Sequence, residues 1–146
     1  MRHEMSSEDA AFRLAFETGG VPPAQFDHRA HVRLAYVYLV EYEPEAATAR
    51  MRSGLQAFLQ HHGLPRAKYH ETLTRAWILA VRHFMERAPG TVSAEALLAR
   101  HPELLDSKIM LTHYSAEVLF SAEARDAFVE PDASPIPRYR KRRAPK

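Results

Sequence analysis

Apolar residues recur at helical spacing along most of the chain, and no stretch shows the alternation of a half-buried strand. Four long segments carry this pattern, at about residues 8–18, 28–42, 44–62 and 69–87. In the segment 28–42 the apolar positions cover much of the helix circumference, so we expect this helix to be central. The other segments have narrower stripes, exemplified by Phe12, Ala15 and Phe16 in the first.

Polar and helix-breaking residues mark the ends of these segments. Ser6 or Ser7 can cap the first helix and Asp27 the second, while Gly63 suits the end of the third. Ser93 should cap a short helix at 94–100, a further helical segment is expected at 104–111, and a last helix at 116–128 can be interrupted at Ser121. The sequence therefore predicts an all-α fold, a single-domain bundle of about five to six helices over residues 1–137.

Length and composition are consistent with one globular domain. The chain has 146 residues, 46% of them hydrophobic, and no cysteine, which excludes disulfides and thiolate chemistry. The first residues lack the apolar core of a signal peptide, and no apolar run approaches the roughly 18 residues that span a membrane. We expect a cytoplasmic protein with no membrane association.

The net charge of +2 hides an asymmetry between the body and the C-terminus. Six of the 20 basic residues lie in the segment 138–146, which has no acid and is predicted to be a disordered tail. The preceding residues carry 14 basic and 18 acidic side chains, a balance near −4. Nucleic-acid binding is therefore not expected except through the tail.

Histidines stand at the predicted start of the second helix. His28 and His31 are three residues apart, so their imidazoles would share a helix face and could bind one divalent metal ion. The alternative is that one or both are half-exposed residues of a first helical turn that form ordinary hydrogen bonds.

A second polar group, Tyr69-His70-Glu71, opens the fourth segment. His70 falls on the predicted core face and should point inward, where it needs a polar partner. Glu71 lies about 100° further around the helix. It could act as a fourth ligand or general base, or it could be an exposed first-turn acid paired with Arg75.

The two helix starts together could form a metal site. His28, His31 and His70 would supply three nitrogen ligands and leave a position open for water or substrate, with zinc or iron the metals expected. Glu71 would be the catalytic base, and Tyr69 or Thr74 could orient it. Thr74 stands where a His-Glu-x-x-His zinc motif requires histidine, so this is not that pattern.

His113-Tyr114-Ser115 is a third polar cluster before a helix. His113 could replace one of the ligands or act as an acid–base catalyst. The alternative is a loop histidine beside the capping Ser115.

These motifs, in this order, resemble a family of small uncharacterised bacterial α-helical proteins. The resemblance rests on residues 26–32, on Tyr69-His70-Glu71-Thr72-Leu73-Thr74, on His113-Tyr114-Ser115 and on the segments 124–125 and 128–132. It covers roughly residues 10–137 and implies an α-helical single domain without an established activity. It also implies that His28, His31, His70, Glu71 and His113 belong together.

Three functions are compatible with this sequence. The first is a metal-dependent enzyme, hydrolytic or oxygen-using, that acts on a small molecule. The second is a non-enzymatic binding or interaction module with a histidine-containing polar core. The third is a metal-free enzyme that uses His70 and Glu71, or His113, for acid–base chemistry. Substrate, metal and oligomeric state are left open.

Overall fold

The computed structural model describes residues 2–136, so the predicted tail at 138–146 lies outside the described residues. Within them the fold is all-α, with seven α-helices, four short 3₁₀ helices and no strand. The α-helices are α1 (Ser7–Glu17), α2 (His28–Glu41), α3 (Pro44–His61), α4 (Glu71–Glu86), α5 (Ala94–Arg100), α6 (Ala116–Leu119) and α7 (Ala122–Asp126). The 3₁₀ helices are η1 (Pro23–Gln25), η2 (Arg66–Lys68), η3 (Pro102–Leu105) and η4 (Ser107–Thr112).

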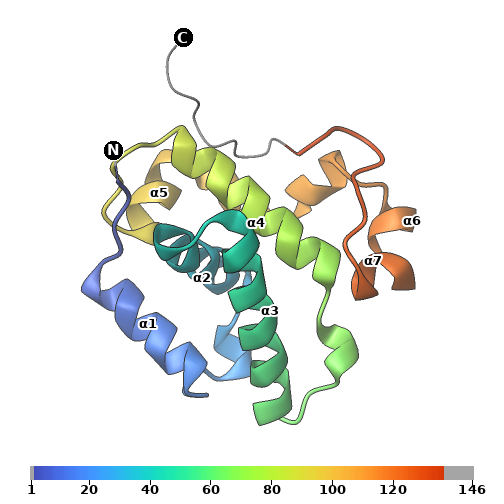
Figure 1. Ribbon diagram of the computed structural model, residues 1–146, viewed down its shortest axis with the longest axis horizontal. Helices are drawn as coiled ribbons and strands as arrows, with labels where there is room; N and C mark the ends of the chain where they lie inside the picture. The colour runs from blue at the N-terminus through green and yellow to red at the C-terminus, as the bar shows by residue number, and fades with distance from the viewer. Residues whose placement is uncertain (1, 137–146) are drawn as a thin grey trace.

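The centre of the fold is a three-helix unit of α2, α3 and α4, which all pack on one another (Figure 1). Helix α1 packs against α2 and α3, α5 against α2, and α7 against α4. The run Leu34–Leu39 in α2 is buried without interruption. This confirms the prediction that the second helix is central, because only a helix covered on several sides can bury six consecutive residues.

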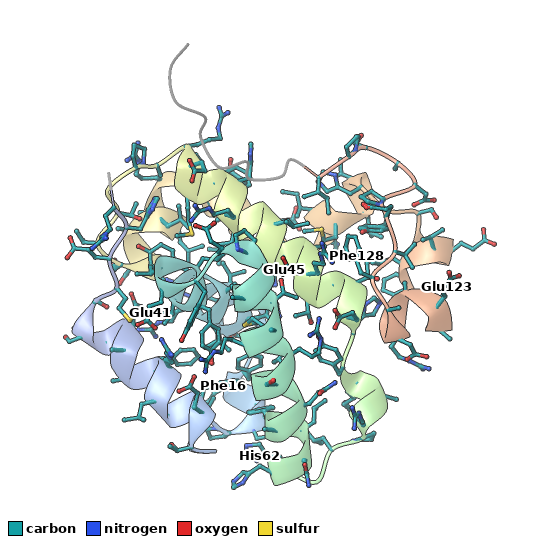
Figure 2. All side chains as sticks on the ribbon, viewed as in Figure 1. Phe16, Glu41, Glu45, His62, Glu123 and Phe128 are labelled. Atoms are coloured by element: carbon teal, nitrogen blue, oxygen red, sulfur yellow. The ribbon has the colours of Figure 1, made fainter. Side chains whose placement is uncertain are left out.

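Aromatic packing closes the space between α1, α3 and the turn before α2. Phe16 stacks on Phe26 and Phe58, with ring centroids 5.1 and 5.4 Å away. Figure 2 shows Phe16 between α1 and α3. These rings place Phe26, and with it the start of α2, against the side of α3.

None of the described helices is long and apolar enough to cross a bilayer.

The helix starts follow the predicted capping chemistry. Ser6 and Asp9 form a reciprocal capping box on α1, Asp27 accepts the Ala30 amide of α2, and Ser93 caps α5. At the end of α3, Gly63 has a φ of 65°, and the Leu64 amide donates to the Leu59 carbonyl. This is the left-handed turn for which glycine was predicted.

Three boundaries differ from the predictions or refine them. Helix α4 begins at Glu71 rather than Tyr69, because His70 is extended and serves as its N-cap. The segment predicted as a helix at 104–111 forms η3 and η4 instead, since Asp106 between them is extended. The helix predicted at 116–128 is interrupted at Ser121, as anticipated, and Ser121 caps α7. These divisions explain why the helix count exceeds five to six.

Candidate functional site

The starts of α2 and α4 meet at one pocket, which we call the His31 pocket. It has a volume of about 250 Å³ and lies between α2, α3 and α4. Four of the predicted site residues line it, namely His31, Tyr69, His70 and Thr74. The other lining residues are Lys68 and five apolar side chains, Phe26, Leu55, Phe58, Leu59 and Leu73. The structure therefore brings the two predicted histidine clusters together, in a mostly apolar cavity.

His31 is the polar group of this pocket with unused hydrogen-bonding capacity. Among the described residues, no partner bonds to either of its ring nitrogens. Burial lowers the pKa of His31 to about 4, and the nearby His28 contributes in the same direction. The ring is therefore neutral at pH 7, with one N–H donor and one nitrogen acceptor. It can exchange a hydrogen bond with a molecule in the pocket.

His28 points away from the pocket lining and joins α2 to η3. Its Nε2 donates to the Leu104 carbonyl oxygen over 2.9 Å, and its ring meets the edge of Trp77 with centroids 4.5 Å apart. These contacts explain why a histidine in the first turn of α2 is only half-exposed. Its partner lies 76 residues further along the chain, beyond the reach of local sequence reasoning.

His70 uses both ring nitrogens for structure. Its Nδ1 accepts the Leu73 amide over 3.0 Å, so the proton must be on Nε2. Nε2 donates to the Leu119 carbonyl oxygen over 2.7 Å. One imidazole thus caps α4 and ties it to the end of α6. Although His70 lines the pocket, its nitrogens are not available to a ligand in this arrangement.

Glu71 is held in a polar network with Arg52 and Tyr69. Arg52 in α3 donates to both of its carboxylate oxygens, over 2.8 and 2.6 Å, and the Tyr69 hydroxyl donates over 2.6 Å. The Arg52 hydrogen bonds hold the pKa of Glu71 below its usual value, so it stays ionised. The expected alternative partner was Arg75, whereas Arg75 lies over the Phe128 ring. The Thr74 hydroxyl donates to the His70 carbonyl over 2.8 Å.

His113 lies apart from the His31 pocket, at the C-terminal segment. Its Nδ1 donates to the Ser134 carbonyl oxygen over 2.8 Å, and its own carbonyl accepts the Ala133 amide. Ser115 caps α6, as predicted. The geometry matches the alternative of a loop histidine beside a capping serine, and His113 is not among the residues that line the pocket.

The described residues contain no group of three or more histidine, aspartate or glutamate side chains placed to hold a metal ion. His70 uses both ring nitrogens, so a three-histidine site would require it to give up one of these partners, whereas His28 can keep its Nε2 bond to the Leu104 carbonyl and offer Nδ1. Metal binding by His28, His31 and His70 stays a prediction, which elemental analysis of the reconstituted protein would test.

A second, larger pocket is one that no motif in the sequence indicates. It has a volume of about 680 Å³ and lies between α3, η2, the start of α4 and α7. Three arginines line it together with Gln56, Tyr69, Glu71, Asp126 and Phe128; the arginines are Arg52, Arg66 and Arg125. They are far apart in the chain and share no motif, so no local signal could have grouped them.

Comparisons with family models, with curated proteins and with solved structures found no match. The resemblance noted from the motifs therefore stays a prediction.

Proposed function

We propose that this protein binds a small, uncharged, mostly apolar molecule in the His31 pocket. The observation that carries this proposal is His31 itself, a neutral imidazole without a hydrogen-bond partner among the described residues, in a cavity lined largely by apolar side chains. Ligand sites combine such apolar walls with a few placed polar groups. Of the functions considered from the sequence, this corresponds to the binding module with a histidine-containing core.

The size of the cavity limits the ligand. A dry apolar cavity of about 150 Å³ holds benzene. The His31 pocket, at about 250 Å³, has room for a single ring with small substituents. A hydroxyl or carbonyl on that ring would exchange a hydrogen bond with His31, and the rest would contact Phe26, Phe58 and Leu73.

Charged ligands are less suited to this site. Burial disfavours the imidazolium form of His31, so the pocket offers no fixed counter-charge at its His31 wall. Lys68 is exposed and its ammonium can stay in water. The same argument makes His31 a hydrogen-bonding group rather than a proton donor at pH 7.

The test compares phenol with toluene, which has a similar shape but no hydroxyl, by NMR titration of the full chain. We expect phenol to shift the His31 ring signals and to bind more tightly than toluene. His31→Phe keeps an aromatic ring but removes its nitrogens, so it should weaken phenol binding about five-fold or more and leave toluene binding nearly unchanged.

His83→Phe is the matched control, because His83 is also half-buried, has a pKa lowered by burial, and lies in the last turn of α4. It should leave both affinities unchanged. Equal phenol binding by the wild type and His31→Phe, or no binding of either probe, would contradict the proposal.

A further inference from the structure

The larger pocket is a site of a different kind. Three guanidinium groups line it, from Arg52 in α3, Arg66 in η2 and Arg125 in α7. Two carboxylates, Glu71 and Asp126, also line it, which leaves one more positive than negative side chain. Both carboxylates are already occupied by the arginines beside them.

The ion pairs leave one edge of two guanidinium groups free. Arg52 bonds to Glu71 through Nε and Nη2, and Arg125 bonds to Asp126 through the same two nitrogens. In each case the bonds to the carboxylate do not use the donors on Nη1, which can serve another acceptor, and Arg52 also interacts with the Tyr69 hydroxyl. The carboxylates therefore orient two arginine forks, and the end of each fork suits a second oxyanion.

Arg66 adds a third guanidinium without such a pairing. It is exposed, and no carboxylate among the described residues forms an ion pair with it. Phe128 also lines the pocket and gives it an aromatic surface, with the Arg75 guanidinium carbon 4.6 Å from the ring centroid. Figure 2 shows Phe128 beside α4, toward the C-terminal segment. The pocket thus combines oxyanion donors with an apolar surface.

We propose that this arginine pocket, defined by Arg52, Arg66, Arg125 and Phe128, binds a small organic phosphate. The phosphate oxygens accept hydrogen bonds from the guanidinium ends, and the organic part covers Phe128. The site is separate from the His31 pocket, although Tyr69 lines both. It therefore does not depend on the function proposed above.

The experiment measures phenyl phosphate and inorganic phosphate binding to the full chain by calorimetry, at constant ionic strength set with sodium chloride. We expect both to bind, with phenyl phosphate a few-fold tighter because its ring contacts Phe128. Arg66→Ala should weaken phenyl phosphate binding about five-fold or more, since it removes a charged donor from an exposed position without breaking an ion pair.

Two further variants separate the site from general charge effects. Arg52→Lys retains the positive charge beside Glu71 but loses the forked guanidinium group, so it should also weaken phenyl phosphate binding about five-fold. An unchanged unfolding temperature of this variant would show that its fold is intact. Arg100→Ala removes an exposed charge at the end of α5 and should change the affinity less than about two-fold.

Other outcomes would overturn the proposal. If Arg66→Ala and Arg100→Ala weaken binding equally, or neither does, the phosphate is attracted by general charge or by the basic residues at 138–146. Absence of any heat beyond the sodium chloride control would overturn it directly. His31→Phe should leave phosphate binding intact, so failure of one proposal is distinguishable from failure of the other.

Discussion

At the scale of single residues, similar side chains have different roles because of their surroundings. His28, His70 and His113 each have a nitrogen on a backbone carbonyl, whereas the nitrogens of His31 have no partner among the described residues. From the sequence, His28, His31 and His70 are equally good candidates for metal ligands. Only the positions of distant carbonyls separate them, and these make His31 the candidate for binding a ligand in the pocket, while the other rings bond to the backbone.

The neutral, partly buried His31 should make stability depend on pH. Its pKa is lowered to about 4 in the folded protein, from an ordinary value of 6.5. Between these values the unfolded chain binds a proton that the folded chain does not, so stability falls as the pH decreases from 6.5 toward 4. We expect the free energy of unfolding to fall by about 1 to 2 kcal/mol, which is less than the full pKa shift implies because the ring is partly exposed.

Urea unfolding of the wild type and His31→Phe, at pH 7 and at pH 4.5, measures this effect. The variant should lose less stability over this interval. Glu71→Gln is the control. The pKa of Glu71 is lowered in the folded protein, so the stability that this carboxylate contributes is lost as the pH falls from its unfolded pKa through its folded pKa, below this interval. An identical pH dependence of His31→Phe and wild type would contradict the expectation.

At the scale of helices, much was predictable because the signals are local. The capping residues of α1, α2, α5 and α6 and the glycine after α3 each act within four or five residues of the helix end. The fourth helix was misjudged because histidine is not among the usual N-cap residues. A ring nitrogen that accepts the Leu73 amide does the work of a serine or aspartate oxygen.

His70 should accordingly contribute to stability through two separable bonds. His70→Ala removes the cap and leaves the Leu119 carbonyl without its donor, so we expect a loss of about 1–3 kcal/mol in the free energy of unfolding. His70→Asn supplies a capping oxygen but does not span the distance to Leu119, and it should recover part of that loss. Denaturant unfolding measures both, and equal losses would show that the cap contributes nothing.

At the scale of the whole molecule, the buried Thr72 hydroxyl is one of the groups that attach the C-terminal segment to the core. Thr72 in α4 donates to the Ala127 carbonyl over 2.9 Å and accepts the Val129 amide over 3.1 Å. The Tyr114 hydroxyl donates to the Val129 carbonyl beside it. This attachment holds α7 against α4 (Figure 1). Together with Phe128, α7 forms one side of the arginine pocket.

Thr72→Val keeps the shape of this side chain but removes the partner of the part-buried Val129 amide and of the Ala127 carbonyl. We expect it to destabilise the protein by about 1–3 kcal/mol and to speed hydrogen exchange at the Val129 amide. Thr48→Val is the matched control, because the Thr48 hydroxyl bonds only within its own helix, to the Pro44 carbonyl. Equal effects of the two variants would contradict a role for Thr72 in attaching the segment.

The amino-acid sequence alone determined the helical class, the central position of the second helix and most helix ends, because apolar spacing and capping operate over a few residues. It also indicated that the residues around His31 and His70 belong together. Only the tertiary structure decided what each does. The carbonyl partners of His28 and His70 lie 76 and 49 residues away, and Arg52 reaches Glu71 from another helix. Hydrogen bonds over such separations depend on how the helices pack, so which ring nitrogens stay free for a ligand was settled only by the folded chain.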